Sequence, residues 1–126
     1  MAKKKIRIKA GKVNVLAELN NSKIANLIWE ALPLSCSVNT WGEEIYFSIP
    51  VQAELNNPRD VVEKGDLGYW PDGPAFCIFF GPTPVSSEGQ IRPASSVEIV
   101  GRVCGNPEDF KQVGPGVTIT LERLSD

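Results

Sequence analysis

Short runs in which apolar and polar residues alternate, each bounded by glycine or proline, are the feature of this sequence that most restricts its fold. In residues 4–9 isoleucines alternate with basic residues, and residues 13–19 alternate again after a turn centred on Gly11. Such alternation is typical of a β-strand with one buried face, and the short turn predicts a β-hairpin. Residues 117–122 alternate in the same way and predict the last strand.

The middle of the chain contains further extended segments separated by strong turn signals. Ile45, Phe47 and Ile49 alternate with Tyr46 and Ser48, so the two sets are expected on opposite faces of one strand. The sequence PDGP at positions 71–74 is a strong turn signal between two more short strands. The predicted middle strands lie within residues 36–50, 67–70, 76–80 and 97–104.

Two segments carry helix signals. Residues 22–32 place apolar side chains at helical spacing behind the capping residue Ser22, and Pro33 predicts the end of this helix. A second short helix is expected from Asn106, which can cap it, with Pro107 at its first position. We therefore predict one domain over residues 1–126, mainly β: a closed eight-stranded antiparallel barrel with two short helices capping its open ends.

Charge and composition exclude several classes of protein. Six of the thirteen cations lie within the first twelve residues, beginning at Lys3, and no second basic patch extends this run. Nucleic-acid binding is therefore not expected. No run reaches the ~18–20 apolar residues of a membrane span, and no apolar segment follows the basic N-terminus. We expect neither a membrane segment nor a secretory signal, and hence a cytoplasmic location.

Cysteine and histidine usage bears on metal and redox chemistry. Cys36, Cys77 and Cys104 are an odd set without CxxC spacing, which argues against a disulfide framework and a structural zinc site. The chain contains no histidine, and its acidic residues show no tight ligand spacing. We therefore expect no metal and no other cofactor.

Aromatic residues gather in one part of the chain. Residues 65–84 hold five of the ten aromatic side chains together with four glycines and four prolines. Tyr69 and Trp70 directly precede a turn, and Trp41 precedes Gly42. Rings at strand ends suit the rim of a binding site, whereas Phe79 and its aromatic neighbours in residues 76–80 also suit the packed interior of a barrel.

Several motifs resemble the cyclophilin family. The segments FCIFFG, VEIVGRV and NPEDFKQVGPGVTITLERL are similar to its Phe-Phe strand, its Val-x-Gly-x-Val strand, and its second helix with the closing strand. VNTWGEEIYFSIP and GDLGYWPDGPAFCIFFG resemble a group of atypical, uncharacterised single-domain cyclophilin-like proteins of prokaryotes. The resemblance covers nearly the whole chain and implies a cyclophilin-like barrel.

The resemblance also implies an activity, the cis/trans rotation of X–Pro peptide bonds in an apolar pocket. The second Phe of the family's pair, which floors that pocket, corresponds to Phe79. The family's catalytic Arg has no counterpart here, because residues 38–50 contain no arginine and its position falls on Phe47. The resemblance therefore implies weak or absent isomerase activity.

Other residues remain as candidates for the missing donor. Arg92 follows the loop after the Phe79 strand, and Arg59 and Arg102 are weaker candidates. Glu43 and Glu44 stand beside Trp41, and a carboxyl group near an aromatic wall can act as an acid or base. Adjacent residues on a strand point to opposite faces, so at most one of the two acids faces a pocket.

Three hypotheses for the function follow. The first is a protein that binds a small apolar or proline-containing ligand, such as an X-Pro peptide. The second is an active prolyl isomerase with a non-standard donor, Arg92 or Glu43. The third is a protein–protein interaction module. In the first, the binding groove would be lined by Trp41, Phe47, Tyr69, Trp70 and Phe79.

Overall fold

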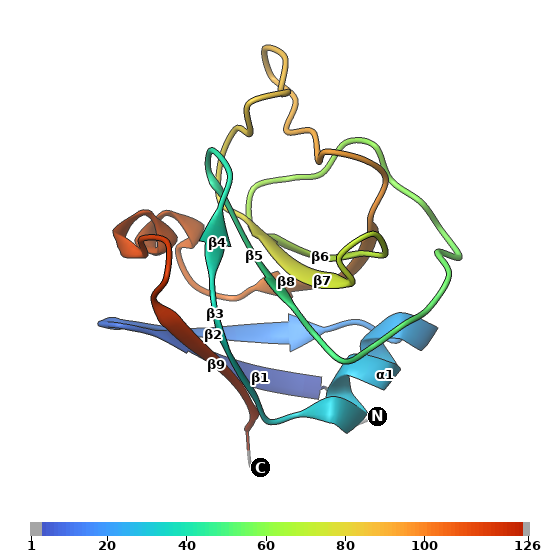
Figure 1. Ribbon diagram of the computed structural model, residues 1–126, viewed down its shortest axis with the longest axis vertical. Helices are drawn as coiled ribbons and strands as arrows, with labels where there is room; N and C mark the ends of the chain where they lie inside the picture. Colours follow the sequence, from blue (N-terminus) through green and yellow to red (C-terminus); the bar gives the residue numbers. More distant parts are fainter. Residues whose placement is uncertain (1–3, 125–126) are drawn as a thin grey trace.

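The computed structural model describes residues 4–124, so Lys3 of the basic run lies outside the described residues. These residues form one antiparallel sheet of nine strands, in the order β3-β9-β1-β2-β8-β6-β7-β5-β4, with an α-helix and a 3-10 helix (Figure 1). The elements are β1 Lys4–Ala10, β2 Val13–Leu19, α1 Lys23–Ala31, β3 Leu34–Ser37, β4 Asn39–Thr40, β5 Glu44–Ser48, β6 Asp66–Trp70, β7 Ala75–Phe79, β8 Glu98–Val103, η1 Pro107–Gln112 and β9 Thr118–Arg123.

The sheet curls into a nearly closed barrel, as the sequence predicted. Strands β3 and β4 stand at opposite ends of the strand order, yet only Val38 separates them in the chain. The Val38 N–H donates to the Val117 carbonyl at 3.0 Å, and the Gly116 N–H donates to the Val38 carbonyl at 2.9 Å. One bent segment therefore joins both edges of the sheet. Counting β3 and β4 as one bent strand gives the eight strands that were predicted.

The N-terminal hairpin follows the predicted alternation. Ile6 and Ile8 are fully buried, while Lys5 and Lys9 are exposed. Strands β1 and β2 pair in register through the turn at Gly11, whose φ of 58° lies in the left-handed region that favours glycine. The predicted hairpin is therefore confirmed, and its apolar face contributes to the main core.

Both predicted helices are present. The Ser22 hydroxyl accepts a hydrogen bond from the Ala25 N–H at 3.2 Å, which caps α1, and the helix ends two residues before Pro33. The second helix, η1, is a 3-10 helix capped by the side chain of Asn106. Phe110 on η1 is fully buried, and Figure 1 shows the two helices on different sides of the barrel.

The segment 36–50, expected as one extended region, is divided into three strands. It bends at Val38 and reverses at a tight turn between Trp41 and Glu44, whose backbone groups exchange hydrogen bonds of 2.9 and 3.2 Å. Gly42 in this turn has a φ of 61°, which an L-residue with a side chain rarely adopts. A glycine at this point therefore starts a hairpin, with β4 and β5 as its arms.

Strands β5, β7 and β6 are neighbours and have two different faces. Ile45, Phe47, Tyr69, Phe76 and Ile78 belong to the main core inside the barrel. The alternate residues point outward, where Cys77 and Phe79 form a second cluster with loop residues Val62 and Val97. This outer face carries the candidate site.

Two loop segments cover the outer face. Arg59 pairs with Val97, and Val62 pairs with Ile91, as isolated β-bridges between segments more than 25 residues apart. The buried Glu98 carboxylate accepts hydrogen bonds from two backbone N–H groups of residues 56–57, at 2.6 and 3.0 Å. These contacts hold the loop before β6 and the loop before β8 over the sheet.

Candidate functional site

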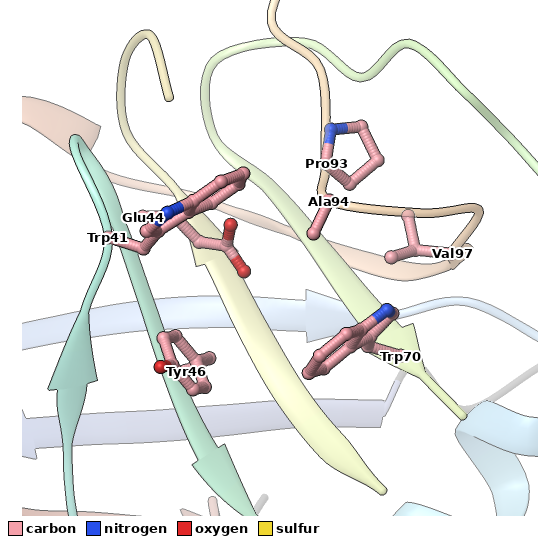
Figure 2. Close-up of a pocket in the computed structure, with 7 residues that line it drawn as sticks. All are labelled: Trp41, Glu44, Tyr46, Trp70, Pro93, Ala94 and Val97. Atoms are coloured by element: carbon pink, nitrogen blue, oxygen red, sulfur yellow. The ribbon is translucent and has the colours of Figure 1, made fainter. Parts of the chain in front are cut away.

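A pocket of about 250 Å³ opens on the outer face of strands β5, β7 and β6 (Figure 2). Three aromatic rings and one carboxyl group come from the strands and the β4–β5 turn, and a short apolar segment comes from the loop before β8. The lining residues are Trp41, Glu44, Tyr46, Trp70, Pro93, Ala94 and Val97. Ligand pockets for drug-sized molecules typically span roughly 300–1,000 Å³. This pocket therefore suits a small molecule or a single chemical group.

On this face of the sheet, small residues lie between large ones. Tyr46 pairs with Cys77, and Cys77 in turn pairs with Gly68, so these three residues form one row across β5, β7 and β6. Trp70 lies two residues beyond Gly68 on the same face of β6. Because Gly68 has no side chain, the Phe79 ring and Val97 pack over it, and a Cβ at this position would lie 3.1 Å from the Phe79 ring. The Tyr46 and Trp70 rings pack against this buried cluster.

The Tyr46 and Trp70 rings form adjacent walls. Their centroids are 6.4 Å apart, and their planes are inclined by 79°. The Trp70 indole N–H donates to the Ser95 hydroxyl at 2.6 Å, and that hydroxyl lies 3.4 Å from an Asp72 carboxylate oxygen. This chain of polar contacts fixes the orientation of the Trp70 ring.

The packing of the β4–β5 turn holds the Trp41 side chain in place at one side of the pocket. A side chain on Gly42 would approach Pro84 Cδ to 2.7 Å and Thr83 Cα to 2.9 Å. The Glu43 N–H donates to the Pro82 carbonyl at 2.8 Å. The turn is thus pressed against residues 82–84, and this contact determines where the Trp41 indole stands.

Glu44 contributes the carboxyl group of the pocket. Its residue is only 6% exposed, and Figure 2 shows the carboxyl pointing into the space between Trp41 and Trp70. Burial raises the pKa of the Glu44 carboxyl to about 7, while a hydrogen bond from the Cys77 thiol acts in the opposite direction. Burial, together with the nearby Glu44, raises the pKa of the Cys77 thiol well above its usual value. Near neutral pH, the Glu44 carboxyl therefore changes between its neutral and ionised forms, while the buried Cys77 thiol beside it stays protonated.

The five aromatic residues predicted to line the groove are divided between the pocket and the core. Trp41 and Trp70 line the pocket. Phe47 and Tyr69 do not, because their side chains point to the inner face: Phe47 stacks on Phe76, and the Tyr69 hydroxyl donates to a backbone carbonyl at 2.8 Å. Phe79 is fully buried in the second cluster, on the same face as the pocket but beneath its surface.

Of the donor and acid–base candidates from the sequence, Glu44 lines the pocket, whereas Glu43, Arg92 and Arg102 lie outside its lining. The Glu43 side chain points away from Glu44. It packs against Gly81, in the space that a Cβ at that residue would occupy. Arg92 immediately precedes the lining residue Pro93, but its guanidinium donates to the Gln90 side chain at 2.7 Å. The weaker candidate Arg102 forms an ion pair with Asp66 at 2.8 Å.

The pocket also contains Tyr46 and three loop residues, which sequence reasoning did not select. Tyr46 and Glu44 share a face, and the alternation of residues 44–48 was a signal for this pairing. The loop residues Pro93, Ala94 and Val97 reach the pocket through long-range bridges. The sequence carried no local signal for their position.

Two further features concern metal ions and membranes. Among residues 4–124, no three His, Cys, Asp or Glu side chains are grouped so that they could hold a metal ion. The helices described for this chain include none with the length and apolar character needed to span a bilayer.

Comparisons with known proteins agree with this architecture. The family model described as Cyclophilin-like matches residues 4–122. The solution structure of the hypothetical protein AF2241 from Archaeoglobus fulgidus is similar, with a TM-score of 0.81 and 38% sequence identity. That alignment covers 97% of this chain and 95% of AF2241.

A more distant structure shares the fold. McbB, solved in complex with tryptophan, aligns with a TM-score of 0.71 and 17% identity, over 96% of this chain and 45% of McbB. No curated protein sequence matches the chain. With the family model matching nearly the whole chain and AF2241 sharing more than a third of its residues, this chain belongs to the cyclophilin-like family.

Proposed function

We propose that this protein binds a small apolar or proline-containing ligand in the pocket between Trp41, Tyr46 and Trp70. The observation that carries the proposal is an aromatic, concave surface with one carboxyl group at its centre, built on rigid strands. Apolar pockets with a few convergent polar groups are the usual form of small-ligand sites. The loop wall of Pro93, Ala94 and Val97 adds apolar surface that could contact a proline ring or an alkyl group.

Tryptophan fluorescence provides a direct test. The chain has three tryptophans, and Trp29 lies on α1 outside the pocket lining, so a Trp29→Phe variant restricts the signal to Trp41 and Trp70. We expect a saturable change on titration with X-Pro peptides or with small apolar ligands that do not fluoresce. Trp70→Ala should remove the response. A linear or absent response to all of these ligands would argue against a binding pocket.

A second candidate function, prolyl isomerase activity, is favoured by the state of Glu44. Its pKa of about 7 means that below this pH the carboxyl is mostly protonated and can donate a hydrogen bond within the pocket. The resemblance to cyclophilins implies that such a donor, an Arg in that family, assists rotation by bonding to the prolyl nitrogen. In this second candidate, Glu44 takes the role of donor.

Isomerase activity can be measured by exchange spectroscopy on an X-Pro peptide at several pH values. If Glu44 is the donor, the rate should fall as pH rises through about 7, since the ionised carboxylate can only accept hydrogen bonds. Glu44→Gln keeps an N–H donor and should lose the pH dependence, whereas Glu44→Leu should lose the activity. An unchanged rate in Glu44→Leu, or no catalysis at any pH, would exclude Glu44 as a catalytic donor.

A further inference from the structure

We propose that the pocket is selective for an alkylated ammonium group, such as the head group of a small quaternary amine, held between the aromatic rings and the Glu44 carboxylate. This inference rests on the proposed binding function and names the chemical class of the ligand. Three arguments support it, from the rings, from the charge balance and from the loop wall.

The arrangement of the rings suits a cation. Aromatic faces carry partial negative charge, and quaternary ammonium groups bind where several such rings surround them. Tyr46 and Trp70 stand nearly perpendicular at 6.4 Å, so they form two adjacent walls, and Trp41 stands on another side of the space (Figure 2). Three rings around a volume of about 250 Å³ can contact one compact head group from several directions.

The charge balance of the pocket favours the same ligand. Glu44 is the acid in the lining, and the lining residues that the structure describes include no Lys or Arg. The nearest basic residue in sequence to the loop wall, Arg92, donates its guanidinium to Gln90. An ionised Glu44 therefore has no basic partner within the pocket lining, and a bound cation would supply one. A buried carboxylate without a partner is costly, so pairing should contribute to affinity.

The loop wall explains why the ammonium should be alkylated. Pro93, Ala94 and Val97 present apolar side chains to the pocket. A bare ammonium carries three N–H donors and is strongly hydrated, so it would leave donors unsatisfied against this wall. Methyl groups on nitrogen remove those donors and provide apolar contact, while the charge remains.

Proton linkage adds a specific expectation. The titratable group in contact with the Glu44 carboxyl is the Cys77 thiol on β7, whose own pKa burial raises well above its usual value. Tyr46, on β5 with Glu44, is the other titratable residue of the pocket lining. The pKa of Glu44 is about 7, so the carboxyl changes charge near neutral pH. A cation should bind the ionised form, and its affinity should rise about tenfold from pH 6 to pH 8. A neutral apolar ligand should show the opposite trend.

The test compares choline with its uncharged isostere 3,3-dimethyl-1-butanol in the Trp29→Phe protein, by fluorescence titration and calorimetry. The two molecules have the same shape and differ in charge. We expect choline to bind at least about tenfold more tightly at pH 8, since cation–aromatic contact and ion pairing act on choline alone. Equal or tighter binding of the isostere would overturn the inference and leave the apolar-ligand function standing.

Variants and a second ligand pair complete the test. Glu44→Gln should reduce choline affinity about tenfold at pH 8 and remove its pH dependence. The isostere should bind more tightly to this variant at pH 8, because the neutral Gln side chain resembles the protonated carboxyl. A trimethyl-lysine peptide and its unmodified counterpart distinguish a peptide source of the head group from a free small molecule. If neither choline nor the trimethyl-lysine peptide binds, the inference is overturned. The titration with X-Pro peptides and apolar ligands then decides the proposed function independently.

Discussion

The two faces of strands β5, β7 and β6 differ in what their side chains do, although the same backbone carries both. On the inner face, Phe47 and Phe76 stack with centroids 5.4 Å apart, and both rings are buried in the barrel core. On the outer face, Phe79 and Val97 pack over Gly68, and the Tyr46 and Trp70 rings pack against this cluster and line the pocket. The alternation of side chains along each strand therefore separates a face that fills the barrel core from a face that lines a pocket.

The two faces also differ in how completely their buried polar groups are hydrogen-bonded. The Tyr69 hydroxyl inside the barrel donates to the Val51 carbonyl and accepts from the Ala53 N–H, at 2.8 and 3.1 Å. The Glu44 carboxyl on the outer face has a weak thiol donor, Cys77, and its pKa is raised. Buried polar groups that are fully paired stabilise a fold, whereas an incompletely paired group keeps capacity for a ligand.

The largest expected effect is on stability, and it should differ between ring removal from the inner face and ring removal from the outer face. Phe76→Ala removes a fully buried ring from the inner face and should lower the free energy of unfolding by about 3–5 kcal/mol. Trp70→Ala removes a half-buried ring from the outer face and should cost less, while it abolishes ligand-induced fluorescence changes. Chemical unfolding of both variants measures the difference. Equal losses of stability would show that the outer ring serves mainly for packing.

The second effect concerns Glu44 and pH. In the unfolded chain this carboxyl ionises near its ordinary pKa of 4.5, whereas in the folded protein its pKa is raised to about 7. The stability contributed by the neutral group is fully present below about pH 4.5 and is lost as pH rises to about 7, a loss of about 3 kcal/mol.

Glu44→Gln removes this titration and provides the measurement. Relative to the native protein, the variant should gain stability as pH rises, by about 2–3 kcal/mol from pH 5 to pH 8. Chemical unfolding at several pH values in this range gives both profiles. Parallel profiles for the two proteins would contradict a raised pKa at this carboxyl.

The third effect tests whether the β4–β5 turn positions the outer wall. Gly42→Ala combines a φ of 61° with an approach of 2.7 Å to Pro84 and should cost about 2 kcal/mol in stability. Gly89→Ala is the matched control, because Gly89 has a φ of 77° but a Cβ added there would meet no atom within 4 Å. Only Gly42→Ala should also shift the emission of Trp41. Equal effects of the two substitutions would mean that the contact with Pro84 is unimportant.

Much of the fold follows from local pattern, and the limits of that pattern are physical. Alternation predicted the hairpin of β1 and β2, and capping by Ser22 with Pro33 beyond predicted α1. The break at Val38 depends on hydrogen bonds with residues 116–117, far away in the chain. Local sequence therefore predicted the elements better than the place where the barrel closes.

The site was predictable only in part. Alternation correctly separates Phe47 from Tyr46, but it does not tell which of the two faces is inside the barrel. Phe47 was therefore expected in the groove, where Tyr46 lies instead. Trp41 and Trp70 were correctly placed beside turns. The loop segment 93–97 reaches the pocket through tertiary pairing, which no local pattern encodes.

The smallest expected effect comes from replacing one tyrosine by phenylalanine on each of the two faces. Tyr69→Phe leaves the Val51 carbonyl and the Ala53 N–H without their hydroxyl partner inside the protein, so it should cost about 1–2 kcal/mol. Tyr46→Phe retains the ring on the half-exposed outer face and should change stability by less than about 0.5 kcal/mol. Thermal and chemical unfolding measure both. Because the Tyr46 ring remains, choline affinity should stay within about twofold of the native value, as cation–aromatic contact depends on the ring face rather than the hydroxyl. A larger loss of stability for Tyr46→Phe than for Tyr69→Phe would reverse the assignment of the two faces.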